Sequence, residues 1–210
     1  NISNTNDVLE TVKNELNIDI TILTGHQEAD YSFNSLNMMK IPCDDGILLD
    51  IGGGSSEITI FKDKQVEQQE SIPTGVLKIY NKHISLLYPN KEEQEIIIND
   101  ITDQIHKFNL GSYKKDYLYG IGKTFTTIKK LIEHIKIKTD TSNVIDICLV
   151  NVLLEKLSDN TKECFVPLLQ VDSERIHTIL PSLLIVKALS LEYDIKKIYA
   201  FLLSFNNKMK

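Results

Sequence analysis

The sequence has almost no arginine. Lysine and arginine together number 23, and Arg175 is the only arginine. Aspartate and glutamate number 29, which gives a formal net charge of -6 at pH 7. Because DNA-binding surfaces usually carry excess positive charge, this balance argues against a DNA-binding protein. A small anionic ligand is still compatible, since backbone N–H groups can hold phosphate oxygens locally. Such contacts would come from lysine, hydroxyl groups and backbone, or from arginine outside this chain.

Cysteines and long apolar segments are also scarce. Cys43, Cys148 and Cys164 form no Cys-x-x-Cys pair, which predicts reduced thiols. The longest apolar run, residues 198–203, is far too short to span a membrane, and the first residues lack the pattern of a signal peptide. We therefore expect a cytoplasmic protein that does not enter a membrane. Because the chain does not begin with methionine, we also expect upstream residues to be missing.

The composition that remains is that of a globular protein. The 210 residues are 42% hydrophobic and 25% charged, enough for one large domain. Apolar segments with β-type patterns predict strands at residues 18–24, 47–51, 57–61, 65–71, 117–121 and 198–203. Helical periodicity predicts helices at residues 7–17, 26–39, 74–83, 92–108, 123–135, 143–157 and 173–191. We expect a helix break near Pro167, an N-cap at Ser173 and a bend at Pro181. The order of these strands and helices along the chain predicts an α/β domain, with a mixed sheet of about five strands covered by helices.

The most informative segment follows the predicted strand at 47–51. It reads Asp-Ile-Gly-Gly-Gly-Ser-Ser-Glu and comprises Asp50, Ile51, Gly52, Gly53, Gly54, Ser55, Ser56 and Glu57. Three glycines allow a tight turn without side chains in the way of a ligand. Their N–H groups and the two serine hydroxyls would hold phosphate oxygens, and Asp50 and Glu57 would suit Mg²⁺. The alternative is a simple glycine hairpin with a capping serine.

Two further turns contain glycine. Gly120-Ile121-Gly122 leads from a strand into a helix that begins with Lys123 and Thr124, where free N–H groups and the helix dipole favour an anion. Taken alone, the pattern is equally typical of an ordinary strand-to-helix turn. The turn at residues 71–75, Ser-Ile-Pro-Thr-Gly, reads better as a helix start than as a ligand site.

Glu28 follows the predicted strand at 18–24, in the sequence Thr-Gly-His-Gln-Glu-Ala-Asp from Thr24 to Asp30. A carboxylate in the first turn of a helix stabilises that helix whatever its function. The functional interpretation is a general base, which would orient and deprotonate a water molecule for attack on phosphorus. The residues themselves leave both interpretations open.

The chain resembles the exopolyphosphatase / guanosine pentaphosphate phosphohydrolase (Ppx/GppA) family. Four segments carry the resemblance, in the family's order and approximate spacing: residues 24–29, 50–57, 71–75 and 120–124. The glycine-rich segment at 50–57 is the most specific of them. The resemblance covers nearly the whole chain, is strongest from Ile18 to Ile132, and is weak from about Thr141 onward.

This resemblance implies a fold and a division of the chain. The family belongs to the actin-like/sugar-kinase superfamily, whose members have two ribonuclease-H-like lobes with a cleft between them. Residues 1–24 would supply the last helix and strand of the first lobe, and residues 25–210 the second lobe. The remainder of the first lobe would then be a partner from the same protein. A homodimer is left open.

The resemblance also implies an activity: hydrolysis of the terminal phosphate of inorganic polyphosphate or guanosine pentaphosphate, with Mg²⁺ or another divalent cation as cofactor. Glu28 matches the family's proposed catalytic base, and Asp50 and Glu57 match acidic positions associated with the metal. The remaining matches are to two phosphate loops: Gly52, Gly53, Gly54, Ser55 and Ser56 in one, and Gly120, Gly122, Lys123 and Thr124 in the other.

Several positions depart from the family pattern. Asp30 stands where an arginine usually follows the catalytic glutamate, and Lys123 replaces the last glycine of the second loop. An Asp-x-Gly-Ser-Asn-Ser-like hairpin near the N-terminus is absent, as is an arginine-containing segment just before Asn1. A Leu-Arg-Glu-Gly-like motif is not recognisable in residues 201–208. Two alternatives therefore stay open: a non-catalytic module that senses guanosine tetra- or pentaphosphate, and an ATP-using member of the same superfamily.

Overall fold

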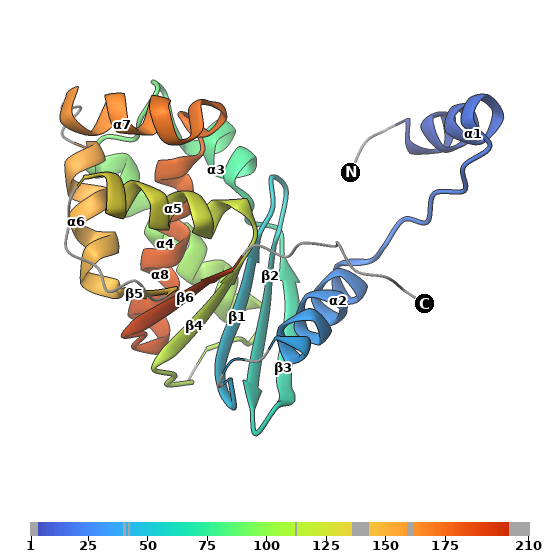
Figure 1. The fold of residues 1–210 in the computed structure, drawn as a ribbon, viewed down its shortest axis with the longest axis horizontal. Coiled ribbons are helices and arrows are strands. Elements are labelled where there is room, and N and C mark those ends of the chain that lie inside the picture. Colours follow the sequence, from blue (N-terminus) through green and yellow to red (C-terminus); the bar gives the residue numbers. More distant parts are fainter. Residues whose placement is uncertain are drawn as a thin grey trace.

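A computed structural model describes residues 4–39, 41, 43–111, 113–135, 143–158 and 162–201. Its centre is a six-stranded sheet in the order β3-β2-β1-β4-β6-β5 (Figure 1). The strands are β1 (Asp45–Ile51), β2 (Ser56–Lys62), β3 (Gln65–Ile72), β4 (Tyr117–Ile121), β5 (Val144–Asp146) and β6 (Lys197–Phe201). β1 pairs antiparallel with β2 and parallel with β4, so it lies inside the sheet. The prediction of a mixed α/β sheet with a buried strand at 47–51 is confirmed.

Helices cover both faces of this sheet, unequally. In the described residues they are α1 (Thr5–Leu16), α2 (Gly25–Met38), α3 (Val76–His83), α4 (Lys91–Lys107), α5 (Lys123–His134), α6 (Ile147–Ser158), α7 (Lys162–Asp172) and α8 (Ile179–Tyr193), with a 3-10 turn, η1, at Ser173–Arg175. Figure 1 shows α3 to α8 gathered on one side of the sheet, while α2 crosses the other side. No single helix in the described part of the chain is long and apolar enough to cross a membrane. Among the described residues, the segments 165–175 and 179–193 have the required length and apolar composition only when they are taken as a pair. The angle between them is 92°.

The alternation of side chains along β1 decides which residues enter the core. Ile47, Leu49 and Ile51 point to the main core on the side of α3 to α8, where each buried aliphatic side chain contributes about 1.5–3 kcal/mol. Leu48 belongs to the smaller core under α2. Since alternate residues share a face, Asp50 points to the α2 side. Because of this alternation along β1, the carboxylate of Asp50 lies on the less covered face of the sheet.

The predicted strand at residues 18–24 does not form. This segment lies outside the helices and strands, and Ile18, Ile20 and Ile22 are 52%, 47% and 57% exposed. Alternating β-branched residues favour an extended chain, but a strand also needs a neighbour to bond with its N–H and C=O groups. No strand of the described sheet pairs with this segment. Figure 1 shows it leading away from α2 to α1, which buries none of its residues.

Four predictions in the second half are also corrected. The helix predicted from residue 143 begins only at α6, because Val144–Asp146 form the edge strand β5 beside β6. Pro167 lies within α7 without breaking it. The helix predicted from Ser173 is instead η1 followed by α8. Pro181 does not bend α8, because it lies in the first turn, where the missing N–H would have no helical acceptor.

Gly120, the second-last residue of β4, has a packing role. A Cβ atom placed there would lie 2.1 Å from Cδ1 of Phe125, whose side chain is fully buried. The absence of a side chain therefore lets α5 approach the sheet immediately after the turn that begins it. This contact accounts for a glycine at position 120 without any role in ligand binding.

Replacement of Gly120 by alanine should lower the free energy of unfolding by about 1–3 kcal/mol, because the core must shift to admit the methyl group. Urea denaturation followed by circular dichroism measures the loss. Combining Gly120→Ala with Phe125→Leu should recover part of it, as expected for two residues in contact. An alanine variant as stable as the parent would contradict the packing role.

Candidate functional site

Asp50 and Glu57 are direct partners across the β1–β2 hairpin. Residues in such a pair have Cβ atoms about 4.5–5.5 Å apart and point to the same face of the sheet. Because both side chains are carboxylates, the pairing is unfavourable when both are ionised. The hairpin therefore holds two negative charges beside each other at the end of the strand, as the sequence predicts.

Glu28 and Ser32 of α2 lie over this pair. The Ser32 hydroxyl donates a hydrogen bond to Oδ2 of Asp50, at 3.3 Å. Burial, followed by the charge of Glu57, raises the pKa of Asp50 to about 6, with a smaller contribution from Glu28. Loss of solvation, followed by the charge of Glu57, also raises the pKa of Glu28. The structure thus brings Glu28, Asp50 and Glu57 together in one electrostatic group.

The start of α2 fixes where Glu28 lies. Thr24 is the N-cap, and it forms a capping box with Gln27: the Gln27 N–H donates to Oγ1 of Thr24, and the Thr24 N–H donates to Oε1 of Gln27. At the first helical residue, Gly25, a Cβ atom would lie 2.4 Å from Cβ of Ser71 at the end of β3. Glycine thus allows the N-terminus of α2 to approach the sheet. Glu28 itself is exposed and accessible to water.

Glu57 is held by two serines. It is 6% exposed, and its Oε1 accepts hydrogen bonds of 2.8 Å from the hydroxyls of Ser55 and Ser71. Ser32 and Ser71 were not among the predicted site residues. For Ser32 a signal existed, since it lies four residues after Glu28 and so on the same helix face. For Ser71, the signal was its position at the head of the turn at 71–75.

The first glycine turn is only partly available to a ligand. The Gly52 N–H donates to the carbonyl of Ser55, at 3.0 Å, and closes the turn. The Ser56 hydroxyl is buried and donates to the carbonyl of Thr74, at 2.6 Å. In contrast, the N–H groups of Gly53 and Gly54 have no partner among the described residues. A Cβ atom at Gly54 would meet nothing within 4 Å. Gly53 and Gly54 are therefore the open part of the turn.

The second glycine turn lies beside the carboxylates. Gly122 has φ of 100°, a left-handed conformation that favours glycine, and its Cβ would lie 3.6 Å from Oδ1 of Asp50. Its N–H donates to the carbonyl of Phe201, at 2.9 Å. The two turns therefore meet at Asp50, although the Gly122 N–H is already bonded.

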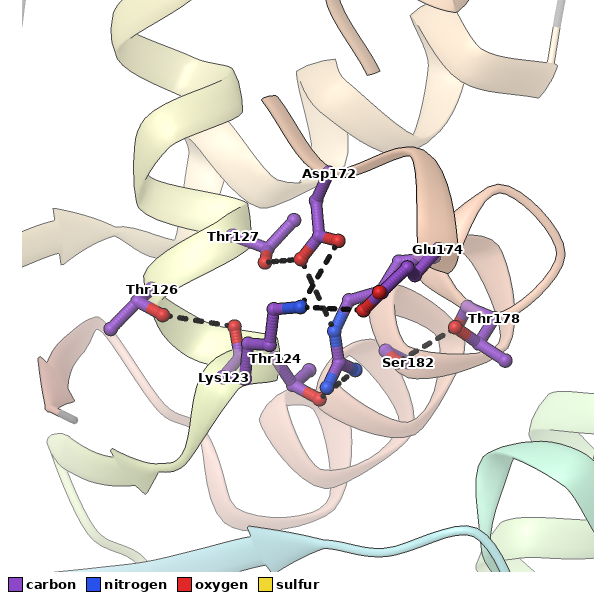
Figure 2. A network of polar contacts seen from close by, with 9 residues as sticks. Lys123, Thr124, Thr126, Thr127, Asp172, Glu174, Thr178 and Ser182 are labelled. Atoms are coloured by element: carbon purple, nitrogen blue, oxygen red, sulfur yellow. Dashed lines mark hydrogen bonds and ion pairs between the residues drawn. The ribbon is translucent and has the colours of Figure 1, made fainter. Parts of the chain in front are cut away.

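Lys123 and Thr124 take part in a polar network that joins α5 to the end of α7 and to η1 (Figure 2). Nζ of Lys123 lies 2.9 Å from Oε2 of Glu174 and 3.3 Å from Oδ1 of Asp172. Nη1 of Arg175 donates to Oγ1 of Thr124, at 2.9 Å. In this structure Lys123 is therefore neutralised by two carboxylates.

Asp172 is the centre of that network. It is 9% exposed, accepts a 2.9 Å hydrogen bond from the Thr127 hydroxyl and lies 3.5 Å from Nε of Arg175. Arg175, the only arginine of the sequence, is thereby placed next to the first turn of α5. The sequence indicated no role for it, because its hydrogen-bond partner Thr124 lies 51 residues away along the chain.

No three Asp, Glu, His or Cys side chains within the described ranges are arranged to hold a metal ion by themselves. Mg²⁺ commonly needs less than that, because it takes one or two carboxylates and completes its shell with water and phosphate oxygens. Asp50 and Glu57 fit this requirement, since they are paired carboxylates on the same face of the sheet and a divalent cation would offset their mutual repulsion.

Comparison with known proteins gives a family match for the sequence. The sequence model of the Ppx/GppA phosphatase family matches residues 1–200. Among solved structures, the exopolyphosphatase from Cytophaga hutchinsonii superposes with a TM-score of 0.78 at 20% identity, over 93% of this chain and 65% of the other. A Ppx/GppA family member from Aquifex aeolicus superposes with a TM-score of 0.76 at 19% identity, over 95% of this chain and 66% of the other.

The chain therefore spans just under two thirds of the length of these two proteins. At this level of identity the superpositions establish the fold. A search of curated proteins gave no significant match.

The raised pKa of Asp50 gives a prediction about stability and pH. Because this pKa is higher in the folded state, protonation of Asp50 stabilises the fold below about pH 4, and the benefit is lost as the pH rises through about 6. Ionisation of Asp50 then lowers the free energy of unfolding by up to about 3 kcal/mol. Asp50→Asn should therefore be more stable than the parent at pH 8, by about 1–3 kcal/mol, and should lose this advantage at pH 4. Urea denaturation at both pH values checks this; equal differences at the two would contradict it.

Proposed function

The chain belongs to the Ppx/GppA phosphatase family, and we propose that the protein hydrolyses phosphoanhydride bonds. Its substrates would be inorganic polyphosphate or guanosine pentaphosphate, from which it releases the terminal phosphate. The observation that carries the proposal is the gathering of Glu28, Asp50 and Glu57 beside a glycine turn whose Gly53 and Gly54 N–H groups have no partner in the described part of the chain. The fold shared with the Cytophaga hutchinsonii exopolyphosphatase supports polyphosphate as the first substrate to test.

In the proposed reaction Glu28 is the general base. Its side chain is exposed enough to bind a water molecule, and its raised pKa makes it a better proton acceptor than an ordinary glutamate. The water oxygen forms a bond to the terminal phosphorus as the bond from phosphorus to the bridging oxygen breaks. The proton of the water passes to Glu28. The products are orthophosphate and a chain shorter by one phosphate.

The remaining groups would bind and orient the phosphates. The N–H groups of Gly53 and Gly54, which have no partner among the described residues, would donate to phosphate oxygens. We propose that Asp50 and Glu57 hold Mg²⁺, which would supply positive charge to the phosphate oxygens. Ser55 and Ser71 fix the carboxylate of Glu57, and Ser32 bonds to Asp50, so these hydroxyls orient the two acids.

Replacing Glu28 by glutamine tests the base directly. In the full-length protein, Glu28→Gln should lower kcat for polyphosphate hydrolysis by about 10²–10⁴ with little change in KM. The matched control is Asp30→Asn, on the same helix. Asp30 accepts a 2.9 Å hydrogen bond from Gln69 that asparagine can still accept, and kcat should stay within about threefold of the parent's. Steady-state phosphate release measures both.

A Glu28→Gln protein with nearly parental kcat would remove Glu28 from the mechanism. If the parent protein binds guanosine pentaphosphate but releases no phosphate, the sensing module becomes the better interpretation. Thermal melts show that both variants are folded, since loss of a charge near a helix terminus costs only about 0.3–1 kcal/mol.

Gly54 allows a separate test of the phosphate loop. Because a side chain there would meet no protein atom within 4 Å, Gly54→Val should keep the fold while obstructing the space over the loop. We expect binding of inorganic tripolyphosphate in the presence of Mg²⁺ to weaken by about a hundredfold or more, measured by isothermal titration calorimetry. Binding as tight as the parent's would show that the ligand does not approach this turn.

A further inference from the structure

The turn at residues 71–75 and the start of α3 contact the glycine turn closely. The Val76 N–H donates to the carbonyl of Gly52, at 3.0 Å, and the Leu77 N–H donates to the carbonyl of Gly53, also at 3.0 Å. The first N–H groups of a helix have no acceptor within the helix. Here the carbonyls of the glycine turn provide those acceptors, so the turn and α3 complete each other's hydrogen bonding.

These bonds determine the direction of the donors that the turn can offer. In a trans peptide the C=O of one residue and the N–H of the next point in opposite directions. Since the carbonyls of Gly52 and Gly53 point toward α3, the N–H groups of Gly53 and Gly54 point away from it. Both of these N–H groups are without a partner among the described residues. The α3 terminus therefore directs them outward, and bonds accepted by the carbonyls also polarise the same peptides and strengthen the donors.

Gly75 makes this contact sterically feasible. A Cβ atom there would lie 2.4 Å from the carbonyl carbon and oxygen of Gly53, and 2.5 Å from N of Gly54. Its backbone, with φ of -107° and ψ of 164°, is extended and open to any residue. The need for glycine therefore comes from the approach of the two backbones, and alanine would have to displace the glycine turn.

The same turn is anchored at two further points. The carbonyl of Thr74 accepts the buried bond from the Ser56 hydroxyl. Ser71 bonds to Glu57 and packs against Gly25, so it links the turn to the carboxylates and to α2. Little freedom remains for the turn to shift relative to the hairpin.

We propose that Gly75 and the first turn of α3 are positioning elements, which hold the N–H groups of Gly53 and Gly54 in the direction needed to bind a substrate phosphate. This inference rests on the proposed function. It assigns a role to a motif that the sequence indicated only as a helix start. The positive end of the α3 dipole acts through the glycine peptides.

Two substitutions test the proposal in different ways. Gly75→Ala adds one methyl group against the glycine turn. Val76→Pro removes the N–H that bonds to Gly52, at the first position of a helix, where proline is favoured. The residue before this proline, Gly75, already has the extended conformation that a proline requires. The helix should therefore persist without that bond.

Each substitution has a matched control. Gly111→Ala adds a methyl group that would lie 3.2 Å from Cδ2 of His106 and 3.3 Å from Oε1 of Glu192. Lys91→Pro places proline at the first position of α4, after the extended residue Asn90. Both controls leave the glycine turn untouched.

In the full-length protein, Gly75→Ala and Val76→Pro should each raise the Kd for inorganic tripolyphosphate with Mg²⁺ by about tenfold to a hundredfold. KM for polyphosphate should rise in parallel, with kcat within about threefold of the parent's, because Glu28 and Asp50 are not moved. The controls should match the parent in Kd, KM and kcat. A merely structural role would move the thermal melt without this separation of KM from kcat.

If a folded Gly75→Ala or Val76→Pro protein binds tripolyphosphate as tightly as the parent, the positioning role is overturned. If Gly75→Ala does not fold, Val76→Pro decides. If the parent itself does not bind tripolyphosphate, the proposed function fails, and hydrogen exchange of the Leu77 amide then tests the positioning contact alone. The contact predicts faster exchange in Gly75→Ala than in Gly111→Ala, and equal exchange would overturn it.

Discussion

Two carboxylates, Asp50 and Glu57, face each other across the β1–β2 hairpin at the point where the strands end. The register of the hairpin keeps them side by side, so their repulsion can be reduced only by protons, hydrogen bonds or a bound cation. Ser32, Ser55 and Ser71 supply the hydrogen bonds. The pKa of Asp50 is still raised to about 6, first by burial and then by the charge of Glu57.

The elements around the hairpin are arranged by close backbone approaches. Gly25 lets α2 reach Ser71, Gly75 lets α3 reach the glycine turn, and Gly120 lets α5 approach β4. In each case a methyl group would lie less than 3 Å from another residue. Three helices can therefore end or begin within the same small region, and this gives Glu28, the glycine turn and Gly122 a common location.

The arrangement separates groups that bind from groups that orient. The N–H groups of Gly53 and Gly54 have no partner within the described ranges, whereas Gly52, Ser56 and Gly122 use their donors within the protein. Such division is expected of a preorganised site, because donors fixed in advance do not have to reorganise when charge arrives. The polar network around Asp172 holds the start of α5 in a comparable way, with Lys123 balanced by carboxylates.

Local patterns in the sequence determined most of the elements and the pairing of Asp50 with Glu57, because helix and strand periodicities and a short glycine hairpin depend on neighbouring residues. The gathering of Glu28 with these acids was expected only from the resemblance to a family. The tertiary structure alone decided that residues 18–24 form no strand and that Lys123 pairs with Asp172 and Glu174. It also decided that the Gly52 N–H is bonded while that of Gly53 has no partner among the residues the structure describes. Each of these depends on a partner distant in the sequence, or on which of several possible bonds the packed backbone makes, and neither is encoded in a local pattern.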